Sequence, residues 1–197
     1  MNNEQITGRS EESYEEAGFE DTREIGAKIN ERMYTFDRRL VLEDRFLTFI
    51  PEDFTEMPEE LAKIKYPSGD RPKTILSDER GAVCFTFNTV DSPLENENVH
   101  ELTEGIKNML QKLNPSYLFY DSGILETEQG VKTGYTEYKS PALDDTVYNL
   151  MYFVPLDGIT MMGTFSCPYG ECEEWRPVVS EALGLTELVR KEEEHNV

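Results

Sequence analysis

The stretch Val147-Tyr148-Asn149-Leu150-Met151-Tyr152-Phe153-Val154 decides the fold of this chain. Side chains alternate between the two faces of a β-strand, so both faces of this segment carry large apolar or aromatic residues. An antiparallel sheet with one wet face would alternate apolar and polar residues instead. The pattern therefore predicts a central strand that other layers of the protein cover on both faces.

This strand belongs to a run of four extended segments between Tyr117 and Cys167. The turns Glu128-Gln129-Gly130 and Pro155-Leu156-Asp157-Gly158 place glycine where a hairpin needs a positive φ. Chain direction reverses at both points, which predicts a four-stranded antiparallel meander.

The remaining elements are expected on both sides of the meander. Two short strands are expected within 34–50, then a short helix over 59–64 and a hairpin that pairs 73–76 with 82–90. Apolar residues recur every three or four positions over 98–113 and over 173–183, which predicts two amphipathic helices. One further helical turn is expected over 185–189. The sum is an α+β fold, a three-layer α/β/α sandwich with a largely antiparallel sheet of about six strands.

The chain is expected to form one domain, because 197 residues suit a single hydrophobic core. Residues 1–24 contain eight acidic and two basic side chains, a formal charge of −6, with few apolar residues between them. Such a segment buries too little surface to offset its ordering entropy. We expect 1–31 to be a mobile or loosely docked acidic segment, 32–189 the folded domain, and 190–197 a polar tail.

The formal net charge of −21 limits the partners of the chain. It repels nucleic-acid phosphates and anionic lipid head groups, so nonspecific binding to nucleic acid or membrane is excluded. A basic protein partner is favoured, although a high net charge also simply keeps a protein soluble. No apolar run approaches the roughly 20 residues that span a bilayer, and the first residues lack the pattern of a secretory signal. The expected compartment is the cytoplasm.

Residues that carry chemistry are sparse. The only histidines are His100 and His195, and no phosphate-binding or dinucleotide motif is present. Cys84 is expected in the core, while the spacing of Cys167 and Cys172 does not suit a zinc or redox site. Carboxylate pairs such as Asp144-Asp145, or Asp121 with Glu126, offer general acid/base chemistry, but 40 acidic residues produce close pairs by chance. No catalytic, cofactor-binding or metal-binding residue is assigned, and no cofactor is expected.

Tyrosines concentrate in the meander and suggest a surface for a partner. Tyrosine combines a rigid apolar body with a polar tip, which suits interfaces, although strands also favour aromatic residues for packing. Arg71, close to Pro67 and Pro72, presents either a fixed cation or the partner of a nearby carboxylate. The candidate partner-binding residues are Tyr117, Tyr120, Tyr135, Tyr138 and Arg71.

The segment Asp44-Arg45-Phe46-Leu47-Thr48-Phe49-Ile50-Pro51-Glu52-Asp53-Phe54 resembles the start of PsbP-like and DcrB-like domains. The similarity is one of element order. It runs from about Leu40 to Leu183, through Val83-Cys84-Phe85-Thr86-Phe87-Asn88, the helix over 98–113 and the closing helix with Trp175. The resemblance implies an α/β/α sandwich of antiparallel strands. It also implies protein binding, which is what most members of this family do. It carries over no catalytic residue.

Two functions are therefore expected. The first is a non-enzymatic protein-binding or chaperone-type module whose partner is a basic protein or an apolar helix. The alternative is a small enzyme with a carboxylate-based site. A purely structural or dimeric protein is a third possibility, and the sequence leaves the oligomeric state open.

Overall fold

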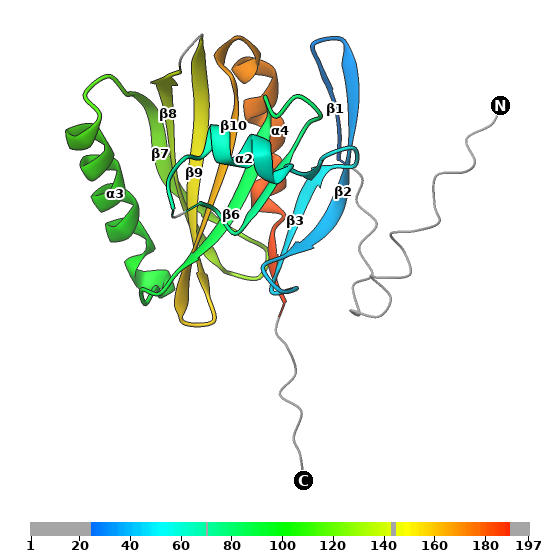
Figure 1. The fold of residues 1–197 in the computed structure, drawn as a ribbon. Coiled ribbons are helices and arrows are strands. Elements are labelled where there is room, and N and C mark those ends of the chain that lie inside the picture. Colours follow the sequence, from blue (N-terminus) through cyan, green and yellow to red (C-terminus); the bar gives the residue numbers. More distant parts are fainter. Residues whose placement is uncertain (1–24, 70, 143–144, 190–197) are drawn as a thin grey trace, which may run out of the picture.

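A computed structural model describes residues 25–69, 71–142 and 145–189, which form two antiparallel sheets and three α-helices (Figure 1). The smaller sheet has the order β1-β2-β3-β11 and the larger one the order β4-β5-β6-β10-β9-β8-β7. The strands are β1 (Ile25–Ile29), β2 (Arg32–Val41), β3 (Phe46–Pro51), β4 (Thr55–Glu56), β5 (Thr74–Ser77), β6 (Cys84–Val90), β7 (Leu118–Glu126), β8 (Lys132–Pro141), β9 (Thr146–Leu156), β10 (Ile159–Pro168) and β11 (Glu187–Leu188). The helices are α2 (Glu59–Lys65), α3 (Val99–Leu113) and α4 (Cys172–Gly184).

Strand β9 is the buried strand that the apolar pattern predicts. It lies between β8 and β10 and pairs with both in antiparallel register. Tyr152 and Phe153 point to opposite faces, and their exposed fractions are only 3% and 2%. The meander from β7 to β10 is confirmed, and its hairpin turns contain Gly130 and Gly158, both at positive φ.

The larger sheet is covered on both faces, but by unlike layers. On one face, α2 and α3 pack on separate clusters that contain Ile75 and Phe153 respectively. On the other face, α4 and the smaller sheet share the main core, which contains Tyr148, Leu150 and Tyr152 from β9. The fold is therefore α+β with mostly antiparallel sheets, and one outer layer combines a helix with a sheet.

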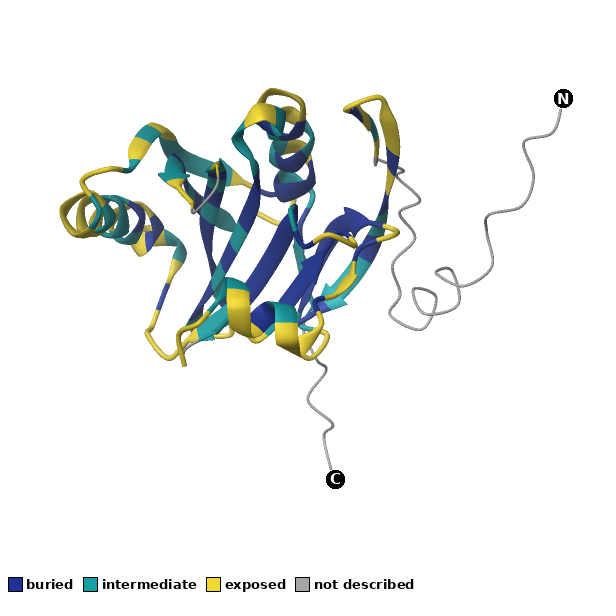
Figure 2. Cartoon of the chain, turned by 45° about the horizontal axis from the view of Figure 1, so that its top comes forward, coloured by how far each residue is buried: buried dark blue, intermediate teal, exposed yellow. Residues whose placement is uncertain are grey.

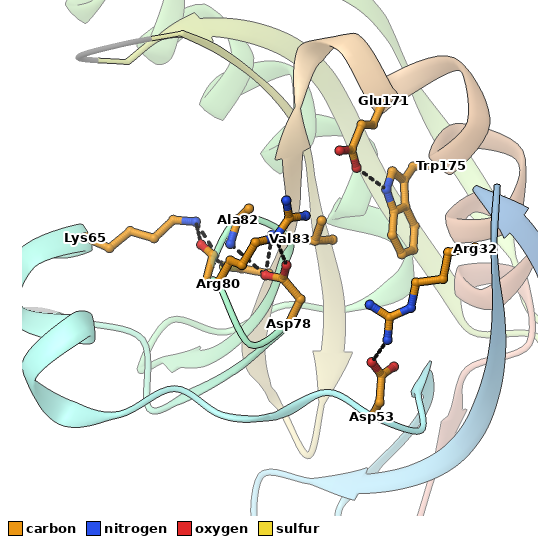
Figure 3. Close-up of polar contacts among 11 residues, drawn as sticks. Arg32, Asp53, Lys65, Asp78, Arg80, Ala82, Val83, Glu171 and Trp175 are labelled. Carbon is orange, nitrogen blue, oxygen red and sulfur yellow. Dashed lines mark hydrogen bonds and ion pairs between the residues drawn. The ribbon is translucent and has the colours of Figure 1, made fainter. Parts of the chain in front are cut away.

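Trp175 of α4 joins the two sheets at the centre of the main core. Its ring is fully buried and lies 5.0 Å from the ring of Tyr34 and 5.3 Å from that of Phe165, between ring centroids. Its Nε1 donates a hydrogen bond to Glu171 (Figure 3). The closing helix is thus fixed by its one tryptophan.

A buried aspartate shapes the turn between β5 and β6. Asp78 Oδ1 accepts hydrogen bonds from the amides of Ala82, at 2.7 Å, and Val83, at 3.0 Å (Figure 3). Gly81 within this turn adopts a φ of +66°, which favours glycine. Figure 3 also shows the ion pair between Arg32 and Asp53.

The structure corrects the expected strand number and arrangement. There are seven strands in one sheet and four in another within the described residues, in place of a single sheet of about six. Ile25–Ile29, expected within the acidic segment, forms β1 and pairs with β2. The stretch 185–189 contains the short strand β11 instead of a helical turn.

The reason for these differences is that short edge strands carry little sequence signal, since only one neighbour fixes them. A smaller difference concerns α4, which begins at Cys172, one residue before the expected start, and contains Pro177. Residues 1–24 and 190–197 lie outside the described residues, so the expectations for the acidic segment and the polar tail there stay predictions.

Candidate functional site

Exposed apolar side chains are most frequent where α3 passes into β7, although they do not all lie on one face of the sheet. Seven large hydrophobic residues are exposed in the described chain, and four of them fall within twelve positions of one another. We call these four the corner surface: Met109, Leu113, Leu118 and Tyr120. A tight turn, in which the amide of Tyr117 donates to the carbonyl of Asn114, joins the two elements. Clustered exposed apolar residues with a polar surround are typical of interaction sites.

The apolar residues at the end of α3 are exposed because the sheet buries this helix fully only near its beginning. Val99 and Thr103 are the buried residues of this helix, and both adjoin Gly134 of β8, where a Cβ would collide with them. Further along, the helix meets the sheet through a polar contact, a 2.7 Å hydrogen bond from Lys107 Nζ to Ser122. Figure 2 shows the outer part of the helix as exposed and intermediate. The end of the predicted apolar stripe is therefore open.

Strand β7 is a long edge of the larger sheet. It is nine residues long, eight of these residues pair with β8, and no described strand pairs with its other side. The opposite edge, β4, has two residues. A register shift between Phe119 and Asp121 sets Tyr120 apart, and the Tyr120 ring stacks on that of Tyr169 with 6.2 Å between centroids. Edge strands present unpaired backbone donors and acceptors that a further strand can bind.

An acidic cleft lies beside this edge, between β7 to β9 and helix α4. Its volume is about 420 Å³. The charged residues that line it are three acids and one base: Asp121, Glu137, Glu173 and Arg176. Glu137 is buried and pairs with Arg176 Nη2 at 2.7 Å, and Tyr135 Oη donates to Asp121 at 3.0 Å. The cleft thus keeps a formal excess of negative charge.

The pKa values of the cleft residues follow from this packing. Burial lowers the pKa of Arg176, but the carboxylate of Glu137 more than offsets this, and the net change is upward. Burial raises the pKa of Tyr135, and its hydrogen bond to Asp121 raises it further. Burial and the neighbouring Tyr169 raise the pKa of Tyr120 to about 12. At neutral pH, Arg176 therefore carries its charge while the tyrosines remain hydroxyl donors.

The structure divides the five candidate partner-binding residues. Tyr117 stacks on Tyr138 at 5.1 Å, on the α3 side of the sheet. Tyr120 and Tyr135 lie on the α4 side, next to Tyr169 and in the cleft respectively. Arg71 lies near α2 and β5, at the other edge of the sheet, and donates to the carbonyl of Ser68 at 3.2 Å. The four tyrosines thus lie near the same edge of the sheet, but on two different faces of it. Arg71 is remote from all of them.

Sequence reasoning missed the apolar members of the corner surface. Met109 and Leu113 belong to the amphipathic stripe, so their pattern indicates burial. Only the position of a helix relative to its sheet shows which part of a stripe is covered. The one available sign of exposure was the position of Leu118, which follows the end of the helix closely and begins the next strand. A strand that begins at a sheet edge is poorly covered.

The described residues that were considered for chemistry are not brought together. Asp121 lines the cleft but Glu126 does not, and Asp144 and His195 lie outside the described residues. All three cysteines are free and buried, and burial raises the pKa of each thiol. Among the described residues, no group of three or more histidine, cysteine or acidic side chains is arranged to hold a metal ion. None of the helices in the described part of the chain is both long and apolar enough to cross a bilayer.

Comparison with known proteins places the fold. No protein-family model matches the chain, and no curated protein matches it. Among solved structures, cyanobacterial PsbP (CyanoP) from Synechocystis sp. PCC 6803 is similar over 78% of this chain and 92% of its own, with a TM-score of 0.55 and 8% identity. The chain therefore has a PsbP-like fold, as its element order predicts.

Two further structures have lower TM-scores. LpqN of Mycobacterium tuberculosis, described as involved in cell envelope biogenesis, covers 74% of this chain and 83% of its own, with 11% identity and a TM-score of 0.49. The immunity protein TplEi of the Pseudomonas aeruginosa T6SS, in complex with an "L" peptide, covers 93% of this chain and 84% of its own, with 9% identity and a TM-score of 0.42. The fold assignment rests on the first match.

Proposed function

We propose that this protein is a non-enzymatic protein-binding module that contacts its partner through the corner surface and the adjoining edge of β7. The observation that carries the proposal is that four of the seven large hydrophobic residues exposed in the described chain lie at the junction of α3 and β7, two on each face of the sheet edge: Met109 and Leu113 on the α3 side, Leu118 and Tyr120 on the α4 side. Burying these side chains against a partner removes apolar surface from water, which drives most protein association.

Charge supports a basic partner. The net charge of −21 and the excess of carboxylates in the neighbouring cleft attract a cationic protein and accelerate its association. The same charge disfavours nucleic acid and anionic membranes as partners. A cytoplasmic location belongs to the same proposal.

Affinity capture with corner variants tests this function. The immobilised protein and the variant Leu113→Ser/Leu118→Ser are exposed to the same cell extract, and the captured proteins are compared. We expect the variant to lose the specific partner, with Ile64→Ser as the matched control, because Ile64 is 78% exposed on α2, away from the corner. Retention of every partner by the corner variant would refute the proposal.

The alternative function is a small enzyme whose carboxylates work in the cleft. The favouring observation is that Asp121 and Glu137 line one cavity of about 420 Å³. Both are already engaged, by Tyr135 and Arg176, which argues for a structural role. Turnover of a small molecule that Asp121→Asn abolishes, without loss of partner capture, would favour the enzyme instead.

A further inference from the structure

We infer that the partner binds as an extended segment with alternating cationic and apolar residues, which adds a strand to the free edge of β7. This inference rests on the proposed function and names the kind of segment that the site takes. Its basis is the edge strand, the unlike chemistry on the two sides of that edge, and the charge of the chain.

The backbone of β7 provides the hydrogen-bonding edge. The strand is nine residues long, and within the described chain its outer side has no strand partner. An added strand would bind through main-chain hydrogen bonds and place successive side chains on opposite faces of the sheet. The two-residue strand β4 at the opposite edge offers much less backbone.

The two faces beside this edge differ in chemistry. On the α4 side lie the cleft carboxylates Asp121 and Glu173, together with the exposed ring of Tyr120. Cationic side chains of an added strand match this side through ion pairs and contact with aromatic rings. Lys139 already illustrates such a contact, since its Nζ lies 3.8 Å from the centroid of the Tyr169 ring.

On the α3 side, the open end of the helix presents Met109 and Leu113, which are 46% and 68% exposed. Apolar side chains of the added strand match this side. Because side chains alternate along a strand, the partner segment is expected to alternate cationic and apolar residues, and not to carry either in a block.

Two other occupants fit the charge poorly. A second copy of the chain carries the same charge of −21, so pairing β7 with itself brings two strongly acidic surfaces together. The chain's own residues 1–24 carry a formal charge of −6 and are repelled by the cleft carboxylates. A cationic segment from another protein therefore matches the site best.

The test uses a nine-residue peptide in which lysine and valine alternate, together with the full chain labelled with ¹⁵N. Titration is expected to shift the backbone amide signals of β7 and the cleft, and not those of β4. Two further peptides carry N-methyl groups, one on every valine nitrogen and one on every lysine nitrogen. These two sets of amides point to opposite edges of the peptide strand. One methylated peptide should bind about tenfold or more weakly and the other nearly as well as the parent.

A matched pair of protein variants tests the charge contact. Asp121→Asn removes the negative charge and keeps one of the two oxygens that accept from Tyr135 and from the amide of Ser122, and it should weaken peptide binding about threefold at low salt. Glu126→Gln removes an acid at the other end of the same strand, outside the cleft lining, and should weaken it much less.

Several outcomes would overturn the inference. Equal binding of both methylated peptides would show that side chains alone hold the segment, and absence of any shift at millimolar peptide would show that the edge does not accept it. A concentration-dependent dimer that Leu118→Ser abolishes, seen by sedimentation, would assign the edge to a second copy. The proposed function would survive the first two results, because it fails only when corner variants keep their partner.

Discussion

At the scale of single residues, two glycines of the larger sheet allow neighbouring side chains to pack closely against its backbone. A Cβ on Gly134 would collide with Thr103 and Val99 of α3, and a Cβ on Gly163 would collide with the ring of Tyr152 on the adjacent strand. Both positions therefore require the absence of a side chain. The close approach at Gly134 also fixes the beginning of α3 and so determines where its apolar stripe becomes exposed.

Replacement of Gly134 tests this packing. Gly134→Ala should lower the free energy of unfolding by about 1–3 kcal/mol, because the helix must shift to admit the methyl group. Gly105→Ala, in the middle of the same helix with no atom within 4 Å of the added Cβ, should be neutral or slightly stabilising. Denaturant unfolding measures both. Equal effects of the two substitutions would contradict the contact.

The buried tyrosines make the protein sensitive to alkali. Burial raises the pKa of Tyr138, Tyr148 and Tyr152 above the ordinary value of 10.0. In the folded protein each hydroxyl stays protonated, while in the unfolded chain it ionises. The unfolded state therefore binds fewer protons above pH 10. Their contribution to stability is therefore complete below pH 10 and is lost as the pH rises from there towards the raised values.

The measurement is the free energy of unfolding against pH. It should fall above pH 10 by up to about 1.4 kcal/mol per pH unit for each such tyrosine. Tyr152→Phe should make the slope shallower, because it removes one of the titrating groups. A flat profile between pH 10 and 11 would show that these hydroxyls ionise freely in the native protein.

At the scale of elements, a partly buried ion pair joins α4 to the meander. Glu137 of β8 is 4% exposed, and its only ion-pair partner among the described residues is Arg176 of α4. Loss of the arginine leaves a carboxylate buried without compensation. Because the Arg176 side chain is 37% exposed, water screens part of this interaction.

Arg176→Met should therefore lower the free energy of unfolding by about 2–3 kcal/mol. The double variant Glu137→Leu/Arg176→Met should recover most of that loss, since no charge then remains buried. Thermal and chemical unfolding of the single and double variants provide the comparison. A double variant as unstable as Arg176→Met alone would mean that packing of the arginine stem, and not its charge, holds the helix.

Much of the arrangement of elements follows from local sequence, and the rest depends on distant contacts. The side-chain pattern of β9 and the glycine turns at Gly130 and Gly158 predict the meander correctly, because both signals are local in the sequence. The strand pair expected within 34–50 is present as β2 and β3, but their separation into a second sheet was not predicted, since β1 is an edge strand in a segment of acidic composition and the two-residue β11 pairs with β3 from far along the chain. The corner surface escaped prediction for a similar reason: exposure of Met109 depends on how α3 lies on the sheet.

At the scale of the whole molecule, the acidic field and the apolar corner act on different steps of partner binding. The field operates over a screening length of about 8 Å at physiological salt, so it steers encounter, while the corner holds the complex by burial. Raising the salt concentration should therefore slow association with the captured partner about tenfold or more and change its dissociation rate much less. Surface plasmon resonance separates the two rates. An association rate that is insensitive to salt would show that the negative charge of the protein does not accelerate partner binding.

The most direct measurement is hydrogen exchange of the protein alone and in complex with its captured partner. Binding at the corner and along the β7 edge should slow exchange of amides in Leu118–Glu126 and in the last turns of α3. Amides of β4, β5 and α2, which lie at the opposite edge, should exchange as they do in the free protein. Protection confined to that opposite edge, with β7 unchanged, would contradict the assignment of the binding surface.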